Sequence, residues 1–275
     1  MCLGGSNPSL SAMIESILAN YTLLTNTVQK VSTFFEHCLY QNEEVLSYAN
    51  SRIVSPDYLK YFHVGFDPGA QQILEFASMN NIDHDLLFRA GILNKFEERV
   101  YSFTSNRLIF PLRDTLGNFV GFGGRILPSQ ELNSHSKYIN TPSSEVFSKS
   151  LFLYNLHNAI PYIQSNKYCV LVEGNMDAVS LFMYGIYNVA APCGTAFTDT
   201  HALLLKCFTN TVIVCYDADF AGEKNAQKTI KTLAKANISS YLLKLPSGDP
   251  DSYVRQYGKD AFLQLLTTSM PLETS

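Results

Sequence analysis

The chain has 275 residues, of which 46% are hydrophobic and 16% are charged. This length and composition allow one large or two small domains with a sizeable core, and they exclude a wholly disordered chain. No apolar run reaches the roughly 18 residues of a membrane span, and we expect no signal peptide, because the first residues lack both its positive charge and its apolar stretch. The net charge of −4 argues against a general nucleic-acid binder, but an average can conceal local patches.

The cysteines and histidines show no metal-binding pattern, since neither C-x-x-C nor H-E-x-x-H occurs. Several cysteines lie in apolar runs, as in Tyr168-Cys169-Val170. We therefore expect buried free thiols in a reducing compartment, with no disulfide framework and no zinc site in this chain.

The N-terminal part is predicted to be largely helical. Residues 1–20 indicate a polar tail that leads into a short helix. Apolar residues then recur at three- and four-residue spacings from Leu24 to Leu39, which predicts an amphipathic helix. Ser55-Pro56 begins another helical stretch, which ends before Gly65 and the Asp-Pro-Gly of 67–69.

The middle of the chain predicts a β-hairpin. Arg107–Leu112 forms the first strand, residues 114–118 the turn, and Phe119–Phe122 the return strand. Pro111 cannot donate a backbone hydrogen bond, so it indicates an edge or a strand end.

From residue 168 onward, strands and helices alternate. Thr198 is a candidate N-cap for one of these helices. The continuous apolar strands predict a parallel sheet covered by helices on both faces. The predicted strands are 168–172, 188–191, 211–216 and 240–245, and the predicted helices are 176–184, 198–208 and 222–236.

Acidic residues follow several of these strands, where open parallel sheets bind ligands. Clustered carboxylates repel one another, and a divalent cation with oxygen ligands, Mg²⁺ or Mn²⁺, removes that penalty. In Asp217-Ala218-Asp219, both carboxylates project to one side of an extended segment. Singly, such acids are often helix caps or solvated loop residues. The acids are Glu173, Asp177, Asp217, Asp219, Asp249 and Asp251.

A basic segment precedes this region: residues 99–149 carry six bases and three acids. Lysine and arginine side chains there could hold phosphate groups. Gly121, Gly123 and Gly124 could let the backbone approach a phosphate, although a tight turn between strands is the simpler interpretation. Tyr138 and Phe147 could stack on bases or pack in the core.

Two acidic motifs resemble those of the Toprim domain, namely the Glu-Gly-x-x-Asp of 173–177 and the Asp-x-Asp-x-x-Gly of 217–222. An ordered series of further motifs resembles the polymerase core of bacterial DnaG-type primases. These motifs are Ser51-Arg52, Val64–Phe66, Ile109–Asp114, Val120–Arg125, Lys137–Pro142, Phe147–Lys149, Leu153–Leu156 and Gly248–Asp251.

The resemblance implies an α/β fold in which a Toprim-type parallel sheet flanked by helices follows a mixed α+β basic subdomain. It divides the chain into a tail and linker helix (1–40), a nucleic-acid- and nucleotide-binding subdomain (41–160), a Toprim catalytic subdomain (161–258) and the start of a C-terminal helical part (259–275). The Met-Pro-Leu of 270–272 matches the point where the family continues into that part.

The resemblance also implies the roles of the site residues. Glu173, Asp217 and Asp219 would be catalytic and would bind Mg²⁺ or Mn²⁺, with Asp177, Asp249 and Asp251 as further metal ligands. The residues that would bind nucleotide and template phosphates are Arg125, Lys137, Lys149 and Arg52.

The implied function is DNA-templated synthesis of short RNA primers. Its partners would be single-stranded DNA, ribonucleoside triphosphates, the RNA primer and a replicative helicase, in the cytoplasm at the nucleoid and away from membranes. The family's zinc-binding and helicase-docking domains are not recognised in this chain, so we expect only the polymerase core. Two alternatives stay open: another Toprim enzyme such as a nuclease, and a degenerate primase fragment that only binds single-stranded DNA.

Overall fold

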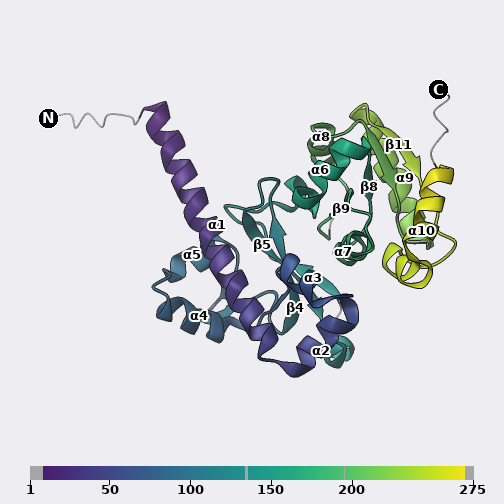
Figure 1. Ribbon diagram of the computed structural model, residues 1–275. Coiled ribbons are helices and arrows are strands. Elements are labelled where there is room, and N and C mark those ends of the chain that lie inside the picture. The colour runs from purple at the N-terminus through teal and green to yellow at the C-terminus, as the bar shows by residue number, and fades with distance from the viewer. Residues whose placement is uncertain (1–8, 134–135, 195, 270–275) are drawn as a thin grey trace.

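The computed structural model describes residues 9–133, 136–194 and 196–269. Two sheets lie side by side, with β4 and β5 between helix α1 and the second sheet (Figure 1). The first is antiparallel, in the order β1 (Gly65–Phe66), β4 (Arg107–Arg113), β5 (Phe119–Ile126) and β6 (Tyr138–Asn140). The second has the order β11 (Ser239–Leu242), β10 (Thr211–Val214), β8 (Cys169–Leu171), β9 (Val189–Pro192) and β7 (Leu153–Tyr154).

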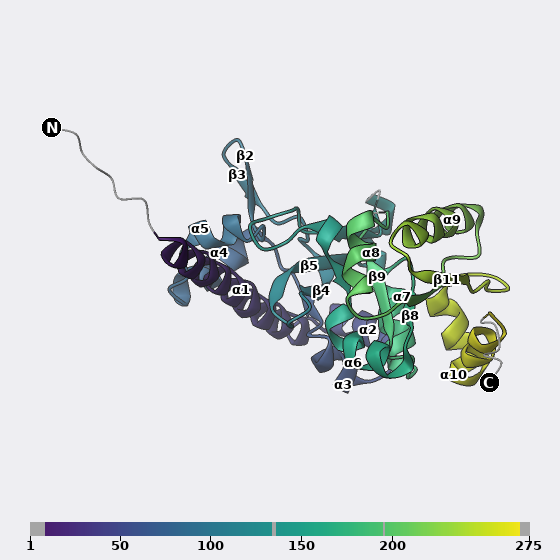
Figure 2. The ribbon, with the colours of Figure 1, turned by 90° about the horizontal axis from the view of Figure 1, so that it is seen from above.

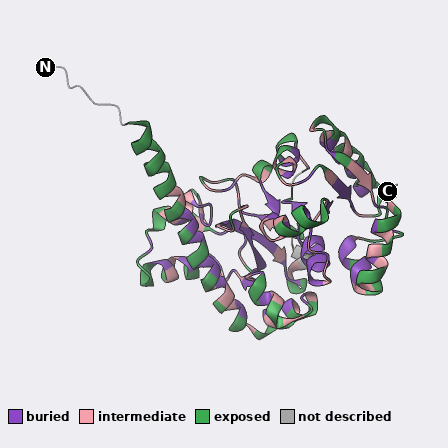
Figure 3. Ribbon diagram, turned by 45° about the horizontal axis from the view of Figure 1, so that its top comes forward, coloured by how far each residue is buried: buried purple, intermediate pink, exposed green. Residues whose placement is uncertain are grey.

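Helix α1 (Leu10–Tyr40) begins where the Ser9 hydroxyl accepts a hydrogen bond from the Ala12 amide. The predicted polar tail is therefore wrong for residues 10–20, which are the first turns of this helix, while residues 1–8 lie outside the described part. The first turns carry exposed apolar side chains such as Leu10 and Ile17. They project from the body, as the green end of the helix shows (Figure 3). A helix face without a packing partner leaves little tertiary signal in the sequence.

The second half of α1 packs as its apolar spacing predicts. Leu24, Val28, Val31 and Phe35 are buried, and the ring of Phe35 meets that of Phe122 edge-on, 5.0 Å between centroids. Burial of four such side chains contributes roughly 1.5–3 kcal/mol each before conformational entropy is counted. This helix therefore anchors the antiparallel sheet that forms one side of the site.

Short elements surround the first sheet. Ser55 caps α3 as predicted, since its side chain accepts from the Asp57 amide and Pro56 is the first helical residue. These elements are α2 (Glu43–Arg52), α3 (Pro56–Tyr61), α4 (Ala70–Met79), α5 (His84–Arg89), β2 (Asn94–Phe96), β3 (Arg99–Tyr101), η1 (Pro128–Asn133) and η2 (Lys149–Leu151).

The predicted hairpin is confirmed, with β5 running on to Ile126. Pro111 lies beyond the two residues of β4 that pair with β1, so its missing donor leaves no gap in the ladder. The tight-turn interpretation of the glycines is wrong, because they lie inside β5. A Cβ on Gly121 would lie 2.6 Å from Thr141 Oγ1. At that position glycine allows a neighbouring side chain to approach closely.

The predicted parallel sheet is also confirmed, with β7 added as an antiparallel edge. Thr198 caps α8 through the His201 amide. Apolar contacts place α6, α8 and α9 on one face of the sheet and α7 and α10 on the other, and Figure 2 shows α9 and α10 on opposite sides of β11. The bounds are α6 (Leu156–Asn166), α7 (Asn175–Met183), α8 (Asp199–Lys206), α9 (Phe220–Lys235) and α10 (Pro250–Ser269).

One apolar core joins the two sheets. It includes Leu108 and Phe110 of β4 together with Val170 of β8, Val172 and Phe262 of α10. Phe147 is buried in the same core and packs against Phe152, 5.4 Å between ring centroids. Phe147 is therefore a core residue, and base stacking by it is excluded.

The structure also tests several smaller predictions. The five cysteines among the described residues are free. Cys169, Cys193 and Cys215 are buried as predicted, but Cys38 is half-buried and Cys207 is exposed, and Cys2 lies outside the described residues. No helix in the described part of the chain is long and apolar enough to span a bilayer. Helix α10 is interrupted at Gly258, whose φ of 80° is left-handed. The Met-Pro-Leu of 270–272 lies outside the described residues.

Candidate active site

A cavity of about 610 Å³ opens where the two sheets meet. Its two walls come from different elements. We call Glu173, Asp177, Asp217 and Asp249 the acidic wall. Three of them lie in loops that follow strands of the parallel sheet, and Asp177 lies in the first turn of α7. We call Arg52, Arg125 and Lys137 the basic wall, since they come from α2, β5 and the segment before β6.

The topology explains the acidic wall. Strands β8 and β10 are parallel neighbours, so Glu173, just after β8, and Asp217, just after β10, emerge at the same edge of the sheet. Asp249 precedes α10 and accepts a hydrogen bond from the Ser252 amide, 2.7 Å between Oδ1 and N. The predicted convergence of these acids on one cavity is thus what the structure shows.

The acidic wall is electrostatically strained. Burial and the charges of Asp217 and Asp219 raise the pKa of Glu173 to about 7. Burial, Asp249 and Asp219 raise the pKa of Asp217 to about 6. Both shifts show that the ionised carboxylates are disfavoured where they stand.

Two oxygens of this wall also lack partners. Among the described residues, neither Glu173 Oε1 nor Asp217 Oδ1 accepts a hydrogen bond, although both atoms are buried. A buried acceptor left unpaired is unfavourable. A hard divalent cation would satisfy these oxygens and neutralise their charge, so the residues present fit such an ion.

The carboxylates do not form a closed cage. No group of three or more histidine, cysteine, aspartate or glutamate side chains within the described ranges is arranged to hold a metal ion. Mg²⁺ commonly keeps water and substrate phosphates as ligands and uses only one or two carboxylates. The open arrangement therefore suits an ion that a substrate helps to bind.

Both carboxylate oxygens of Asp177 accept hydrogen bonds from backbone amides of the protein. Its Oδ2 accepts from the Gly174 amide at 3.0 Å and its Oδ1 from the Asp251 amide at 3.2 Å. Burial and the nearby Asp217 and Asp249 raise its pKa well above the ordinary value. Asp177 thus fixes the starts of α7 and α10 and supports the site from behind.

Asp251 has the opposite environment, because it lies among cations. Arg52 and Arg255 both form ion pairs with it, and Ser180 donates a hydrogen bond. Burial opposes its ionisation, but these hydrogen bonds and the two positive charges lower its pKa below the ordinary value. Asp251 therefore orients arginines that line the cavity.

Arg125 is held on the basic wall by two tyrosines. Its Nε donates to the Tyr48 hydroxyl at 2.6 Å, and its guanidinium carbon lies 5.0 Å from the centre of the Tyr138 ring. Lys137 is exposed and also lines the cavity. Arg125, Lys137 and Arg52 thus face the same space as the carboxylates.

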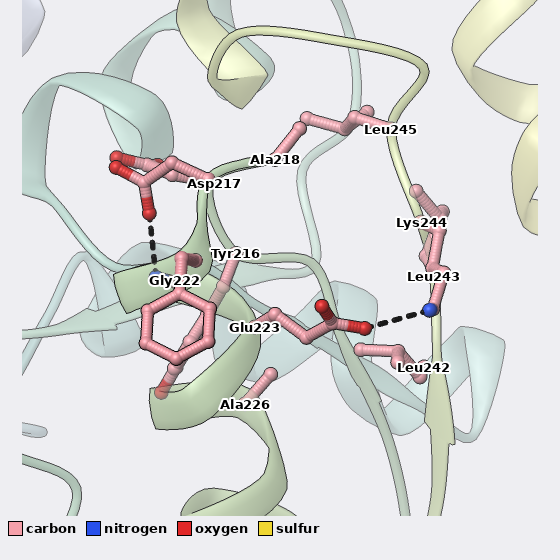
Figure 4. A pocket seen from close by; sticks show the side chains of 12 residues that line it. Tyr216, Asp217, Ala218, Gly222, Glu223, Ala226, Leu242, Leu243, Lys244 and Leu245 are labelled. Carbon is pink, nitrogen blue, oxygen red and sulfur yellow. Dashed lines mark hydrogen bonds and ion pairs between the residues drawn. The ribbon is translucent and has the colours of Figure 1, made fainter.

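The other two predicted residues lie outside this cavity lining. Lys149 is on η2, where its carbonyl accepts from His201 Nε2 at 2.9 Å. Asp219 caps α9, with its Oδ1 accepting from the Gly222 amide at 2.7 Å. It lines a neighbouring groove of about 340 Å³, which Asp217 also lines (Figure 4). In that groove Glu223 and Lys244 form an ion pair at 2.8 Å.

Arg255 and Tyr48 are the site residues that the sequence motifs do not single out. The only local sign of Arg255 is its spacing of four residues from Asp251, which places the two on one face of a helix. Nothing in the sequence near Tyr48 indicates its contact with Arg125.

Neighbouring parallel strands that carry a Glu-Gly and an Asp-x-Asp motif at the same edge of the sheet define the class of Toprim-like domains. The model of that family matches residues 170–254. Toprim and primase proteins typically use a divalent metal ion.

The preceding stretch identifies the family more closely. The N-terminal domain of the DNA primase catalytic core matches residues 34–160. A solved DnaG primase catalytic domain bound to single-stranded DNA is 33% identical, with a TM-score of 0.81, over 93% of this chain and 84% of that one. The chain belongs to the family of DnaG-type DNA primases, within their catalytic core.

Two curated relatives give the extent of the match. The DNA primase of Aquifex aeolicus is 33% identical over 243 residues, which is 88% of this chain and 48% of that protein. The DNA primase of Rickettsia bellii is 36% identical over 271 residues, 96% of this chain and 44% of that protein. The chain therefore spans about half the length of these relatives.

Proposed function

We propose that this chain is the RNA polymerase core of a DNA primase, which joins ribonucleotides into short primers on single-stranded DNA. The observation that carries the proposal is the cavity itself. Unpaired oxygens of Glu173 and Asp217 line the same space as Arg125 and Lys137. Phosphoryl transfer between polyanions needs both kinds of wall, one to hold cations and one to hold phosphates.

Glu173 and Asp217 would bind Mg²⁺ or Mn²⁺ through their unpaired oxygens, Asp219 and Asp249 would serve as further ligands, and Asp177 and Asp251 would support the site. The bound ion would lower the pKa of the primer 3′-hydroxyl and stabilise the pyrophosphate leaving group. Arg52, Arg125 and Lys137 would bind the phosphates of nucleotide and template. Lys149, which lies on η2 outside the cavity lining, would be a further phosphate contact.

The proposed partners are single-stranded DNA, ribonucleoside triphosphates and the growing RNA primer. A structure of a related catalytic domain was solved with single-stranded DNA, which supports the first of these. A replicative helicase would dock on another part of a longer primase. A location at the nucleoid, in the bacterial cytoplasm, follows from that role.

The test is primer synthesis by the full chain on single-stranded DNA with labelled ribonucleoside triphosphates and Mg²⁺. Asp217→Asn removes one unpaired carboxylate, and we expect incorporation to fall by at least about 100-fold, since metal charge stabilisation is worth several kcal/mol. Asp199→Asn is the matched control, because Asp199 is exposed and pairs only with Lys235 on the surface. That variant should retain full activity.

Other outcomes would overturn the proposal. Degradation of the DNA without nucleotides would indicate a Toprim nuclease. Metal-dependent DNA binding without incorporation would indicate a binding protein. Full activity of a folded Asp217→Asn variant would show that the reaction does not need the carboxylates of the acidic wall.

A further inference from the structure

Arg125 is oriented by side chains from two distant segments. Tyr48 lies on α2 and accepts a hydrogen bond from Arg125 Nε across 77 residues of sequence. Tyr138 lies on β6, and its ring is covered by the guanidinium group. Because Nε is engaged, the two terminal amino groups carry the remaining donors. Among the described residues, no hydrogen bond or ion pair engages those two groups.

The tyrosines are themselves held in place. The Tyr48 ring packs against the apolar core that joins the sheets. Tyr48 and Arg52 are four residues apart on α2 and so share a face of that helix. Arg52 in turn pairs with Asp251. Helix α2 therefore orients two guanidinium groups along one side of the cavity.

Orientation matters because a free arginine side chain loses rotamer entropy when it binds a ligand. A guanidinium held at Nε and over a ring presents its two terminal amino groups as a fixed pair of donors. Such a pair fits two oxygens of one phosphate.

We propose that Tyr48 and Tyr138 are positioning residues, which hold Arg125 so that its terminal amino groups bind one phosphate end-on. This inference rests on the proposed function, in which Arg125 binds phosphate. The phosphate belongs either to the backbone of the single strand or to a triphosphate, and the experiment distinguishes these sources.

The experiment is a double-mutant cycle with two probes, a labelled single-stranded DNA oligonucleotide and inorganic tripolyphosphate. Tyr48→Phe removes only the hydroxyl, and we expect about fivefold weaker binding of the probe whose phosphate Arg125 holds. In the Arg125→Gln background, the same Tyr48→Phe change should have almost no effect. This coupling separates positioning of Arg125 from general packing.

Tyr138 provides an internal contrast. Tyr138→Phe keeps the ring face and should bind like the unsubstituted chain, whereas Tyr138→Leu should weaken binding about threefold. Tyr101→Phe is the matched control, because Tyr101 lies on β3 and its ring contacts Phe103. It should change nothing.

The outcomes separate the two proposals. Equal losses from Tyr48→Phe with and without Arg125 would mean that Tyr48 acts by packing, and would overturn the inference while the proposed function stands. Probe binding that is unaffected by Tyr48→Phe would do the same. If the unsubstituted chain binds neither probe, both proposals fail.

Discussion

The two walls of the cavity differ in how their charges are satisfied. On the basic wall, Arg52 forms an ion pair with Asp251 through a terminal nitrogen, although its Nε is buried without a partner in the described structure, and Arg125 donates to Tyr48. On the acidic wall, Glu173 and Asp217 each keep a buried oxygen without a partner in the described structure. Aspartates at the two walls accordingly shift in opposite directions, with the pKa of Asp251 lowered and that of Asp217 raised to about 6. The charges of the two arginines therefore have partners before any ligand binds, whereas a bound cation would stabilise the ionised carboxylates of the acidic wall.

The largest effect on stability is expected from the loss of the Asp251 carboxylate, which forms an ion pair with Arg52 of the basic wall. Asp251→Asn removes the charge that pairs with Arg52 and Arg255, and we expect the free energy of unfolding to fall by about 3 kcal/mol. Urea denaturation of the purified chain measures this. Asp199→Asn is the control and should stay within about 0.5 kcal/mol. A loss below about 1 kcal/mol would show that the charges of the basic wall are no better compensated by their partners than the charges of the acidic wall.

The acidic wall should make the stability of the folded chain depend on pH, because the pKa values of two of its carboxyls are raised. Glu173 and Asp217 retain protons to about pH 7 and about pH 6 in the folded chain, and they ionise near pH 4 when unfolded. Burial lowers the pKa values of His157 and His201, so these two histidines contribute a stability that rises with pH in this range. The folded state holds more protons on Glu173 and Asp217 between their unfolded and folded pKa values, so the contribution of these two carboxyls falls as the pH rises from about 4 to about 7. Since solvent screens both half-buried groups, we expect a decrease of about 1 kcal/mol.

Thermal unfolding in the presence of a chelator, followed across this pH range, measures that decrease. The double variant Glu173→Gln/Asp217→Asn should lack the falling contribution, and Mg²⁺ should reduce it in the unsubstituted chain. Because both chains keep the buried histidines, the difference between their profiles isolates the two carboxyls. A difference that does not fall across this window would contradict the raised pKa values of the acidic wall.

The smallest expected effect on stability is at Lys137. This side chain is exposed and forms no ion pair among the described residues, so Lys137→Ala should change the unfolding free energy by less than about 0.5 kcal/mol. Its loss should still weaken single-stranded DNA binding and reduce the slope of log affinity against log salt by about 1. Binding titrations at several salt concentrations test this. An unchanged slope would show that Lys137 does not contact a phosphate.

Local signals account for what the sequence predicts well. Ser55-Pro56 and Thr198 predict helix starts because a cap is set by a few adjacent residues. Alternating apolar strands and helices predict the parallel sheet, and sheet topology then brings Glu173 and Asp217 to one edge. These inferences need no knowledge of distant contacts.

Distant contacts account for what the sequence does not predict. The Asp251 amide donates to Asp177 across 74 residues, and Arg52 pairs with Asp251 across 199. No spacing rule distinguishes these two acids, which organise the protein, from Asp217, which has an unpaired oxygen. The start of α1 is missed for a related reason, since its first turns have no packing partner in the described chain to leave a pattern.

The core that joins the sheets has a consequence for how this chain folds. The two matched family regions, 34–160 and 170–254, look like separable modules in sequence. In the structure, Phe110 of the first packs in the same core as Val170 of the second. Cutting the chain between them would expose apolar surface on both pieces. We therefore expect the two halves to melt as one cooperative unit and neither half to fold on its own.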